Sequence, residues 1–247
     1  MRRMPSEGVL AAILWLLALA AGGAAAPAAP SAQTVVLRTA DGAQIGATLH
    51  LPSNPQAPAV LLVPMQTRTR EDWEAVASRL AEAGIAALAI DLRGHGGPGT
   101  GPGGVNLEQN MSACLLDVKA GRAFLAGRGE LAGGRVGMAG ASVGANLALA
   151  VAADDLSVRS LALLSAGVEY RGIRGDAPMR KYGNRPALLV ASLEDPYATR
   201  SARELSTFGD GIRELRLLNG AGHGTVMLVR QPDLVGVLVD WFRRTLL

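Results

Sequence analysis

A sharp turn between a strand and a helix is the feature that most restricts how this chain can fold. The segment Arg135 to Leu149 contains the pattern G-x-S-x-G, with Ser142 between Gly140 and Gly144. The apolar residues before the motif are typical of a short buried strand, and those after it are typical of a helix. Glycine at both ends lets strand and helix approach closely, and the turn pushes the serine hydroxyl out toward solvent. The chain is rich in Gly and Ala, so the match can also arise by chance and the remaining sequence must decide.

Strand and helix patterns alternate along the chain from Ala57 onward. This alternation predicts an α/β fold with a mostly parallel central sheet and helices on both faces. Two stretches around Asp41-Gly42 predict an antiparallel strand pair at the N-terminal edge, and the segment Ser165 to Arg185, which contains Pro178, is predicted to be irregular. The predicted strands are Thr34–Arg38, Gln44–Leu51, Ala57–Val63, Ile85–Ile90, Arg135–Ala139, Val158–Leu164, Ala187–Ser192 and Ile212–Leu218. The predicted helices are Thr69–Gly84 with Thr69 as N-cap, Leu107–Leu125, the helix after Ser142, Thr199–Phe208 and Pro232–Leu246.

The N-terminus has the composition of an export signal. Arg2 and Arg3 precede an apolar run from Val9 to Ala21, and small residues follow from Gly22 to Ala32. This order predicts a signal peptide over residues 1–28, with cleavage as late as residue 32. The run is short for a membrane span, so we expect none after cleavage and a membrane anchor only if the segment is retained. Residues 33–247 are then expected to form one domain of a periplasmic or secreted protein.

Composition argues against several classes of partner. The 24 Lys+Arg residues nearly balance the 21 Asp+Glu residues, and no basic cluster suggests nucleic acid. We find no cofactor motif and no cluster of metal ligands, and the Gly/Pro-rich stretch Gly96 to Gly104, predicted to be a loop, lacks the G-K-[ST] of a phosphate loop. Cys114 is the single cysteine and lies on the apolar face of a predicted helix, so we expect it in the core. The sequence leaves the oligomeric state open.

A serine hydroxyl becomes an effective nucleophile only when a base takes its proton. The chain has three histidines. His50 lies inside an early predicted strand, where a sheet-face role is expected. His95 stands between glycines at a strand end but precedes the serine, whereas His223 follows the last predicted strand in a glycine-flanked loop. Such a loop lets an imidazole reach the turn of a neighbouring strand, so His223 is the predicted base.

A carboxylate is needed to orient the imidazole. The segment Leu193-Glu194-Asp195-Pro196 follows a predicted strand, one strand before the histidine loop. Ligands of parallel sheets bind at the carboxyl ends of strands, which favours an acid at this position. Asp195 is the predicted partner of the base and Glu194 is its competitor. The alternative is that Asp195 only begins the next helix, with Pro196 at the first helical position.

The chain order Ser142, Asp195, His223 resembles that of the α/β-hydrolase superfamily. The segment Asp91 to Gly96, D-L-R-G-H-G, is similar to a segment that is structural and lines the site in that superfamily. The short connection from Ser165 to Arg185 leaves no room for a large cap domain, as in the compact dienelactone hydrolase-like and small serine esterase branches. The dienelactone hydrolases themselves carry cysteine where this chain has Ser142.

Two backbone N–H groups are expected to stabilise a reacting oxyanion. The amide of Val143, next after the serine at the start of a helix, is the first candidate. The superfamily often has His-Gly after the strand that supplies the second donor, whereas this chain has Pro64-Met65-Gln66. Proline has no N–H, so Met65 or Gln66 must donate.

The sequence therefore predicts a serine hydrolase that cleaves a carboxylic ester or a similar small acyl substrate through an acyl-enzyme. No cofactor or metal is needed for this chemistry. A peptidase, an amidase or an acyltransferase on the same residues remains an alternative, because specificity depends on the shape of the pocket. A non-catalytic binding module with this fold is a second alternative, which the missing His-Gly favours.

Overall fold

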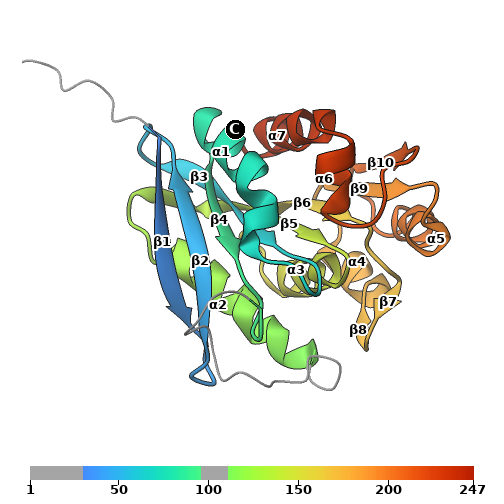
Figure 1. Ribbon diagram of the computed structural model, residues 1–247, viewed down its shortest axis with the longest axis horizontal. Coiled ribbons are helices and arrows are strands. Elements are labelled where there is room, and N and C mark those ends of the chain that lie inside the picture. The colour runs from blue at the N-terminus through green and yellow to red at the C-terminus, as the bar shows by residue number, and fades with distance from the viewer. Residues whose placement is uncertain (1–29, 96–110) are drawn as a thin grey trace, which may run out of the picture.

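The computed structural model describes residues 30–95 and 111–247. An eight-stranded sheet runs through the centre in the order β1-β2-β4-β3-β5-β6-β9-β10 (Figure 1). All neighbouring pairs are parallel except β1–β2 and β2–β4, so the antiparallel pair lies at the N-terminal edge as predicted. The strands are β1 Ser31–Arg38, β2 Gln44–Leu51, β3 Ala57–Val63, β4 Ala86–Ile90, β5 Leu131–Ala141, β6 Val158–Leu164, β9 Ala187–Ser192 and β10 Arg213–Leu218.

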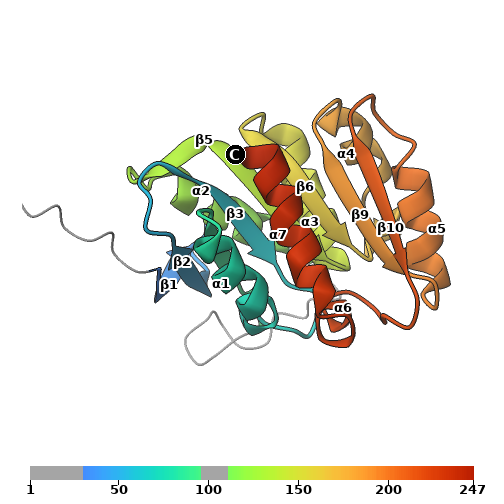
Figure 2. The ribbon, with the colours of Figure 1, turned by 90° about the horizontal axis from the view of Figure 1, so that it is seen from above.

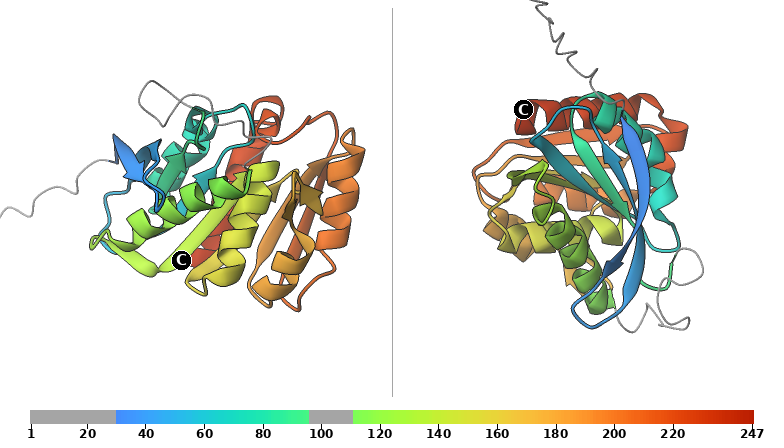
Figure 3. Two further views of the ribbon diagram at one scale, coloured as in Figure 1. Left: turned by 90° about the horizontal axis from the view of Figure 1, so that it is seen from below. Right: turned by 90° about the vertical axis from the view of Figure 1, so that its left-hand side faces the viewer.

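Helices cover both faces of the sheet (Figures 2 and 3). One face carries α1 (Glu74–Glu82), α6 (Val226–Arg230) and α7 (Asp233–Leu246). The other face carries α2 (Cys114–Ala126), α3 (Val143–Asp154), α4 (Asp176–Tyr182) and α5 (Pro196–Leu205). Short 3-10 helices, η1 (Arg70–Trp73) and η2 (Met111–Ala113), precede α1 and α2.

The buried strand β3 shows why helices on both faces are required. Its side chains alternate between the two faces, so Val60 and Leu62 pack in the core under α1 and α7, while Leu61 and Val63 pack in the core under α2 and α3. All seven residues of β3 are buried. Cys114 is buried in the core under α2 and α3, as predicted, and burial raises the pKa of its thiol to about 12.

The prediction of an irregular segment from Ser165 to Arg185 is wrong. This segment forms a small hairpin of β7 (Glu169–Tyr170) and β8 (Ile173–Arg174), followed by α4. Two-residue strands are too short to show a period in sequence. Pro178 does not interrupt α4 because it lies in the first turn, where the backbone N–H groups have no helical partners. The segment is too small to form a cap domain.

Several helix boundaries also differ from the predictions. The helix predicted from Thr69 begins as η1, and the Thr69 side chain makes no capping hydrogen bond. The helix predicted from Thr199 begins at Pro196. The short helix α6 was not predicted. The predicted signal peptide, the loop from Gly96 and the start of the helix predicted from Leu107 lie outside the described residues.

The segment that begins with Asp91 supports the carboxyl end of the sheet. Asp91 is buried and accepts a hydrogen bond from the backbone N–H of Arg70 (2.8 Å), which fixes the start of η1. Arg93 is buried beside Asp117, and its backbone N–H donates to the Asp117 carboxylate (2.8 Å). Burial raises the pKa of both Asp91 and Asp117, although their arginine partners oppose this shift. Asp91 thereby positions the segment after β3, which forms one wall of the candidate site.

Candidate active site

Three predicted residues meet at the carboxyl ends of parallel strands of the sheet. Ser142 follows β5, Asp195 lies shortly after β9, and His223 lies in the loop after β10. His223 Nε2 lies 2.7 Å from Ser142 Oγ, and His223 Nδ1 lies 2.5 Å from Asp195 Oδ2. A continuous hydrogen-bonded chain thus joins a hydroxyl, an imidazole and a carboxylate.

The turn at Ser142 is set by the backbone around it. Ser142 has φ of 53° and ψ of −126°, a conformation that non-glycine residues rarely adopt, and α3 begins at the next residue. Its backbone N–H donates to the Leu164 carbonyl of β6 (2.8 Å). A methyl group on Gly144 would overlap the Pro64 carbonyl, and one on Gly140 would overlap the Gly144 carbonyl. Both glycines of the motif are therefore required by close backbone approach.

Asp195 contacts the imidazole and also caps the next helix. One carboxylate oxygen, Oδ1, accepts the backbone N–H of Ala198 (3.1 Å) and caps α5, with Pro196 at the first helical position. The other oxygen, Oδ2, accepts from His223. The cap fixes the carboxylate, so the oxygen that meets the imidazole is held in a defined direction.

The competing residues have other partners. Glu194 Oε2 accepts the Ser192 hydroxyl (2.6 Å) and the Gly220 N–H (2.7 Å), and so does not serve His223. His50 lies in β2 with Nε2 3.3 Å from Glu74 Oε2, remote from Ser142 in the sheet order. His95 Nε2 accepts the Thr67 N–H (2.7 Å), so it braces the loop after β3.

Two buried serines hold the histidine loop, and no sequence motif marks either of them. Ser192 Oγ accepts the N–H groups of Ala221 (3.0 Å) and Gly222 (3.2 Å). Ser165 Oγ accepts the N–H of Gly224 (3.0 Å) on the other side of His223. Both serines are fully buried at the ends of strands. The backbone on either side of His223 is therefore fixed by side-chain oxygens of the sheet.

A pocket of about 390 Å³ opens at Ser142 and His223. Its other walls are Met65, Gln66 and Thr67 of the loop after β3, and Arg171 of the β7–β8 hairpin. Arg171 Nε donates to Gln66 Oε1 (3.0 Å), so the two walls meet through a hydrogen bond. Both residues predicted as alternatives for the second oxyanion donor, Met65 and Gln66, thus line the pocket that holds the serine.

No group of three or more His, Cys, Asp or Glu side chains that could hold a metal ion occurs in residues 30–95 and 111–247. Over the same ranges, no helix is long and apolar enough to span a membrane.

The fold and the site define an α/β-hydrolase. Residues 55–224 match the family model described as serine aminopeptidase, S33, and because the match spans more than half of the chain, the protein belongs to this family of hydrolases. No curated protein matches the sequence.

Solved structures with the same fold are distant in sequence. A dienelactone hydrolase from Anabaena variabilis is 18% identical with a TM-score of 0.70, covering 88% of this chain and 99% of its own. An acetyl xylan esterase from Paenibacillus sp. R4 is 19% identical with a TM-score of 0.73, covering 88% of this chain and 85% of its own. An esterase from Pyrococcus furiosus is 16% identical with a TM-score of 0.71, covering 88% of this chain and 92% of its own. These likenesses show the fold.

Proposed function

We propose that this hydrolase is an exported serine esterase that cleaves a carboxylic ester or a similar small acyl substrate. The observation that carries the proposal is the hydrogen-bonded chain from Ser142 through His223 to Asp195. An isolated serine is a weak nucleophile, and this arrangement supplies both a base and a group that orients the base. The two esterase neighbours, one of them named for acetyl xylan, agree with this choice.

In the first half-reaction, Ser142 Oγ attacks the acyl carbon while His223 Nε2 takes its proton. Asp195 accepts from Nδ1–H, which keeps the ring in the tautomer with a free Nε2 and stabilises the imidazolium. The tetrahedral intermediate collapses as the bond to the leaving oxygen breaks, and the imidazolium gives that oxygen its proton. In the second half-reaction, water attacks the acyl-enzyme with His223 again as base, and the acid is released with Ser142 restored.

The negative oxygen of the intermediate is assigned to backbone donors. The Val143 amide stands at the N-terminus of α3, where the helix dipole also favours negative charge. The second donor comes from Met65 or Gln66, since Pro64 has no N–H. One such donor is worth roughly a hundredfold or more in rate. The loop that carries these residues is held by His95 and Asp91, which favours a preformed site.

The lining of the pocket favours a small, polar substrate. Gln66, Thr67 and Arg171 present polar groups, and among the described lining residues only Met65 is apolar. A long acyl chain would find little apolar surface to bury there. We therefore expect short-chain esters to be turned over faster than long-chain esters.

A peptide or amide substrate is the second candidate, because the family model is described as a serine aminopeptidase. The two candidates share every catalytic step and differ in the leaving atom, which is nitrogen in an amide and oxygen in an ester. A panel of matched acyl esters and acyl anilides would separate them, with the higher kcat/KM identifying the substrate class.

The test of the proposed function uses purified protein, short p-nitrophenyl esters and a fluorophosphonate. We expect ester hydrolysis, labelling at Ser142, and loss of both in Ser142→Ala, with kcat lower by at least about ten-thousandfold. Equal turnover by the native protein and Ser142→Ala, or no hydrolysis of any ester or anilide, would contradict it and favour a binding module. Export is tested separately by expressing the full chain and sequencing the N-terminus of the mature protein, which should begin between residues 29 and 33.

A further inference from the structure

The β7–β8 hairpin stands apart from the central sheet and is anchored to the helix that follows Ser142 (Figure 1). Asn146, fully buried in α3, accepts the Gly167 N–H through Oδ1 (3.0 Å). Its Nδ2 donates to the carbonyls of Gly167 (2.9 Å) and Ile173 (2.8 Å). One amide side chain thus ties both arms of the hairpin to α3, one turn beyond the serine.

A second anchor comes from the helix that follows Asp195. The hydroxyl of Tyr197 donates to the Glu169 carbonyl (2.5 Å) and accepts the Glu169 N–H (3.1 Å). The Tyr197 ring also meets the Tyr170 ring edge-on, with centroids 5.3 Å apart. The hairpin is therefore fixed from both the serine helix and the helix capped by Asp195.

These anchors place Tyr170 against the reacting groups. Its ring meets the His223 ring at 90°, with centroids 6.3 Å apart, and packs so closely on Gly167 that a methyl group there would overlap it. Burial raises the pKa of its phenol, and the nearby Asp195 carboxylate raises it further, while the Ser142 side chain acts in the opposite direction, so the hydroxyl lies beside these groups. The other two tyrosines of the chain, Tyr182 and Tyr197, direct their hydroxyls to backbone carbonyls. Tyr170 differs because its ring lies against the imidazole of the proposed base.

The side from which Tyr170 approaches sets what it can do. In the sheet, β3 and β6 flank β5 on opposite sides. Met65 and Gln66 follow β3, whereas the hairpin with Tyr170 follows β6. The hairpin with Tyr170 therefore comes from the opposite side of β5 to the strand that carries Met65 and Gln66, and its phenol lies beside the imidazole that protonates the leaving oxygen. Burial, aided by the Asp195 carboxylate, raises the pKa of Tyr170, so the phenol remains a neutral donor.

We propose that Tyr170 is a further catalytic residue, whose O–H donates a hydrogen bond to the leaving oxygen of the ester as its bond to the acyl carbon breaks. This inference rests on the proposed function. Tyr170 keeps its proton throughout: the leaving oxygen takes its proton from the His223 imidazolium and leaves as the alcohol. A donor at this position matters most when the leaving oxygen carries much negative charge, as with alkyl and sugar alcohols. We therefore assign esters of unactivated alcohols as the substrate class of this site.

The test compares Tyr170→Phe with the native enzyme on two acetates, ethyl acetate and p-nitrophenyl acetate. The variant keeps the ring contacts and loses the hydroxyl alone. We expect kcat/KM to fall about tenfold to a hundredfold for the ethyl ester, the size of one hydrogen bond to a charged oxygen, and less than about threefold for the activated ester. The ratio kcat/KM reports acylation, the step in which the alcohol leaves.

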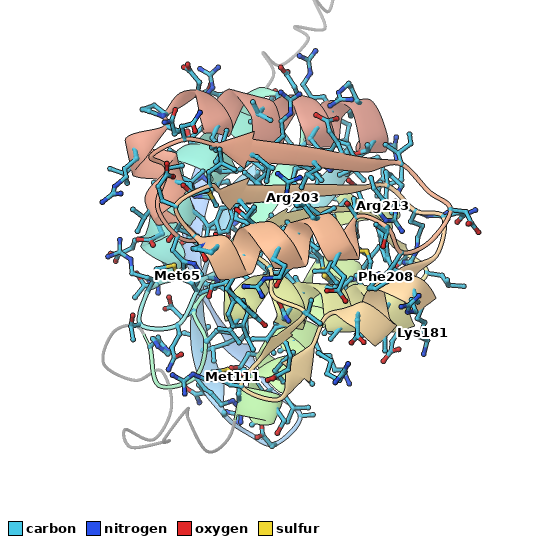
Figure 4. All side chains as sticks on the ribbon, turned by 90° about the vertical axis from the view of Figure 1, so that its right-hand side faces the viewer. Met65, Met111, Lys181, Arg203, Phe208 and Arg213 are labelled. Atoms are coloured by element: carbon cyan, nitrogen blue, oxygen red, sulfur yellow. The ribbon has the colours of Figure 1, made fainter. Side chains whose placement is uncertain are left out.

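Tyr182→Phe is the matched control. Tyr182 donates to the Pro186 carbonyl (3.1 Å) just before β9 begins, at the amino end of the strand whose carboxyl end carries the site. Figure 4 shows its neighbour Lys181 toward the end of the molecule opposite Met65. The control should lose stability and keep both kcat/KM values.

Equal losses on both acetates, or no loss on either, would overturn the role of Tyr170 as a leaving-group donor. If Tyr170→Phe does not fold, the native enzyme decides the question with a series of acetates of graded leaving groups. A shallow dependence of log kcat/KM on the pKa of the alcohol supports the proposal, and a steep one overturns it. Failure of the proposed function is distinguishable, because then the native protein is neither labelled by fluorophosphonate nor active on any acetate.

Discussion

The two sides of Ser142 are built in different ways. On the side of β3 the turn is formed by backbone against backbone, where Gly140 and Gly144 leave no space for a methyl group. On the side of β9 and β10 the loop with His223 is held by side-chain oxygens of Ser165 and Ser192. The β3 side requires residues without side chains, whereas the side of β9 and β10 requires the hydroxyl groups of two serines. Substitutions should therefore affect the two sides differently.

The largest effect is expected at the carboxylate on the histidine side. Asp195→Asn keeps an oxygen for the Ala198 N–H, so the cap of α5 and the stability should change little. It also presents an amide to His223 in place of the carboxylate, which disfavours the tautomer needed for proton transfer. By analogy with the aspartate of serine proteases, kcat should fall by about ten-thousandfold.

Steady-state kinetics and thermal unfolding of the same preparation check this prediction. Glu194→Gln is the matched control, because its side chain retains an oxygen for Ser192 and Gly220 and does not contact His223. If the control loses as much activity as Asp195→Asn, then Asp195 is not the one carboxylate that orients the imidazole.

The second prediction concerns the backbone side. Gly144→Ala forces a methyl group into the Pro64 carbonyl, and no flexible side chain is available to move away. We expect a loss of about 3 kcal/mol in the free energy of unfolding, together with a loss of ester turnover, because the turn and the adjoining loop must shift. Chemical denaturation measures the first quantity.

Gly236→Ala controls for the change from glycine to alanine. Gly236 lies on the exposed face of α7 with open space around it, so alanine should stabilise the protein by about 0.5 to 1 kcal/mol and leave activity unchanged. Similar unfolding free energies for the two variants would show that the turn at Ser142 tolerates a side chain and that the contrast between the two sides is wrong.

The same contrast explains what could be predicted from the sequence. Close backbone approach requires glycine, so the turn around Ser142 leaves a short local motif. The parallel strands also read clearly as buried apolar runs, and their order along the chain was enough to suggest Asp195 and His223. Local pattern and chain order therefore predicted the fold and the candidate triad.

The supporting residues could not be predicted in this way. Ser165 and Ser192 are single serines at strand ends, and their importance depends on a loop that arrives tens of residues later. Tyr170 belongs to a hairpin too short to show a period, held by Asn146 from a different element. Contacts between distant segments carry this information, and one sequence does not display them.

The third prediction tests the side-chain support directly. Ser192→Ala leaves the N–H groups of buried Ala221 and half-buried Gly222 without their acceptor. Stability should fall by about 1 to 3 kcal/mol, and kcat by about tenfold because the imidazole is less well positioned, with KM nearly unchanged. Ser206→Ala, which removes a hydroxyl bonded to the Arg203 carbonyl at the end of α5, should change neither. Unchanged kcat in Ser192→Ala would mean that the loop does not need this support.

The smallest effect is expected at the link between the two sides. Thr225, two residues after His223, donates to the carboxylate of Asp72 in η1, which also binds Arg68 (2.6 Å). Burial alone would raise the pKa of Asp72, but the hydrogen bonds from Arg68 and Thr225 outweigh it, and the pKa is lowered from its ordinary value of 3.8. A carboxyl group with a lowered pKa in the folded state stabilises the protein above its ordinary pKa.

That stabilisation is lost as the pH falls through 3.8 toward the lower, folded-state value, because the carboxylate must then take up a proton. Asp72→Asn should therefore cost about 0.5 to 1 kcal/mol near neutral pH, the size of a partly exposed ion pair, and the difference from the native protein should shrink as the pH falls below 3.8. Thermal unfolding across this range measures the loss of stability, with Asp240→Asn on the outer face of α7 as a control that should change little.

The same variant has a kinetic prediction. Because the link joins the serine and histidine sides, kcat of Asp72→Asn near neutral pH should fall less than kcat of Ser192→Ala. A larger fall in kcat would mean that the two sides act as one unit. They would then differ in the contacts that hold them but not in how they respond to substitution.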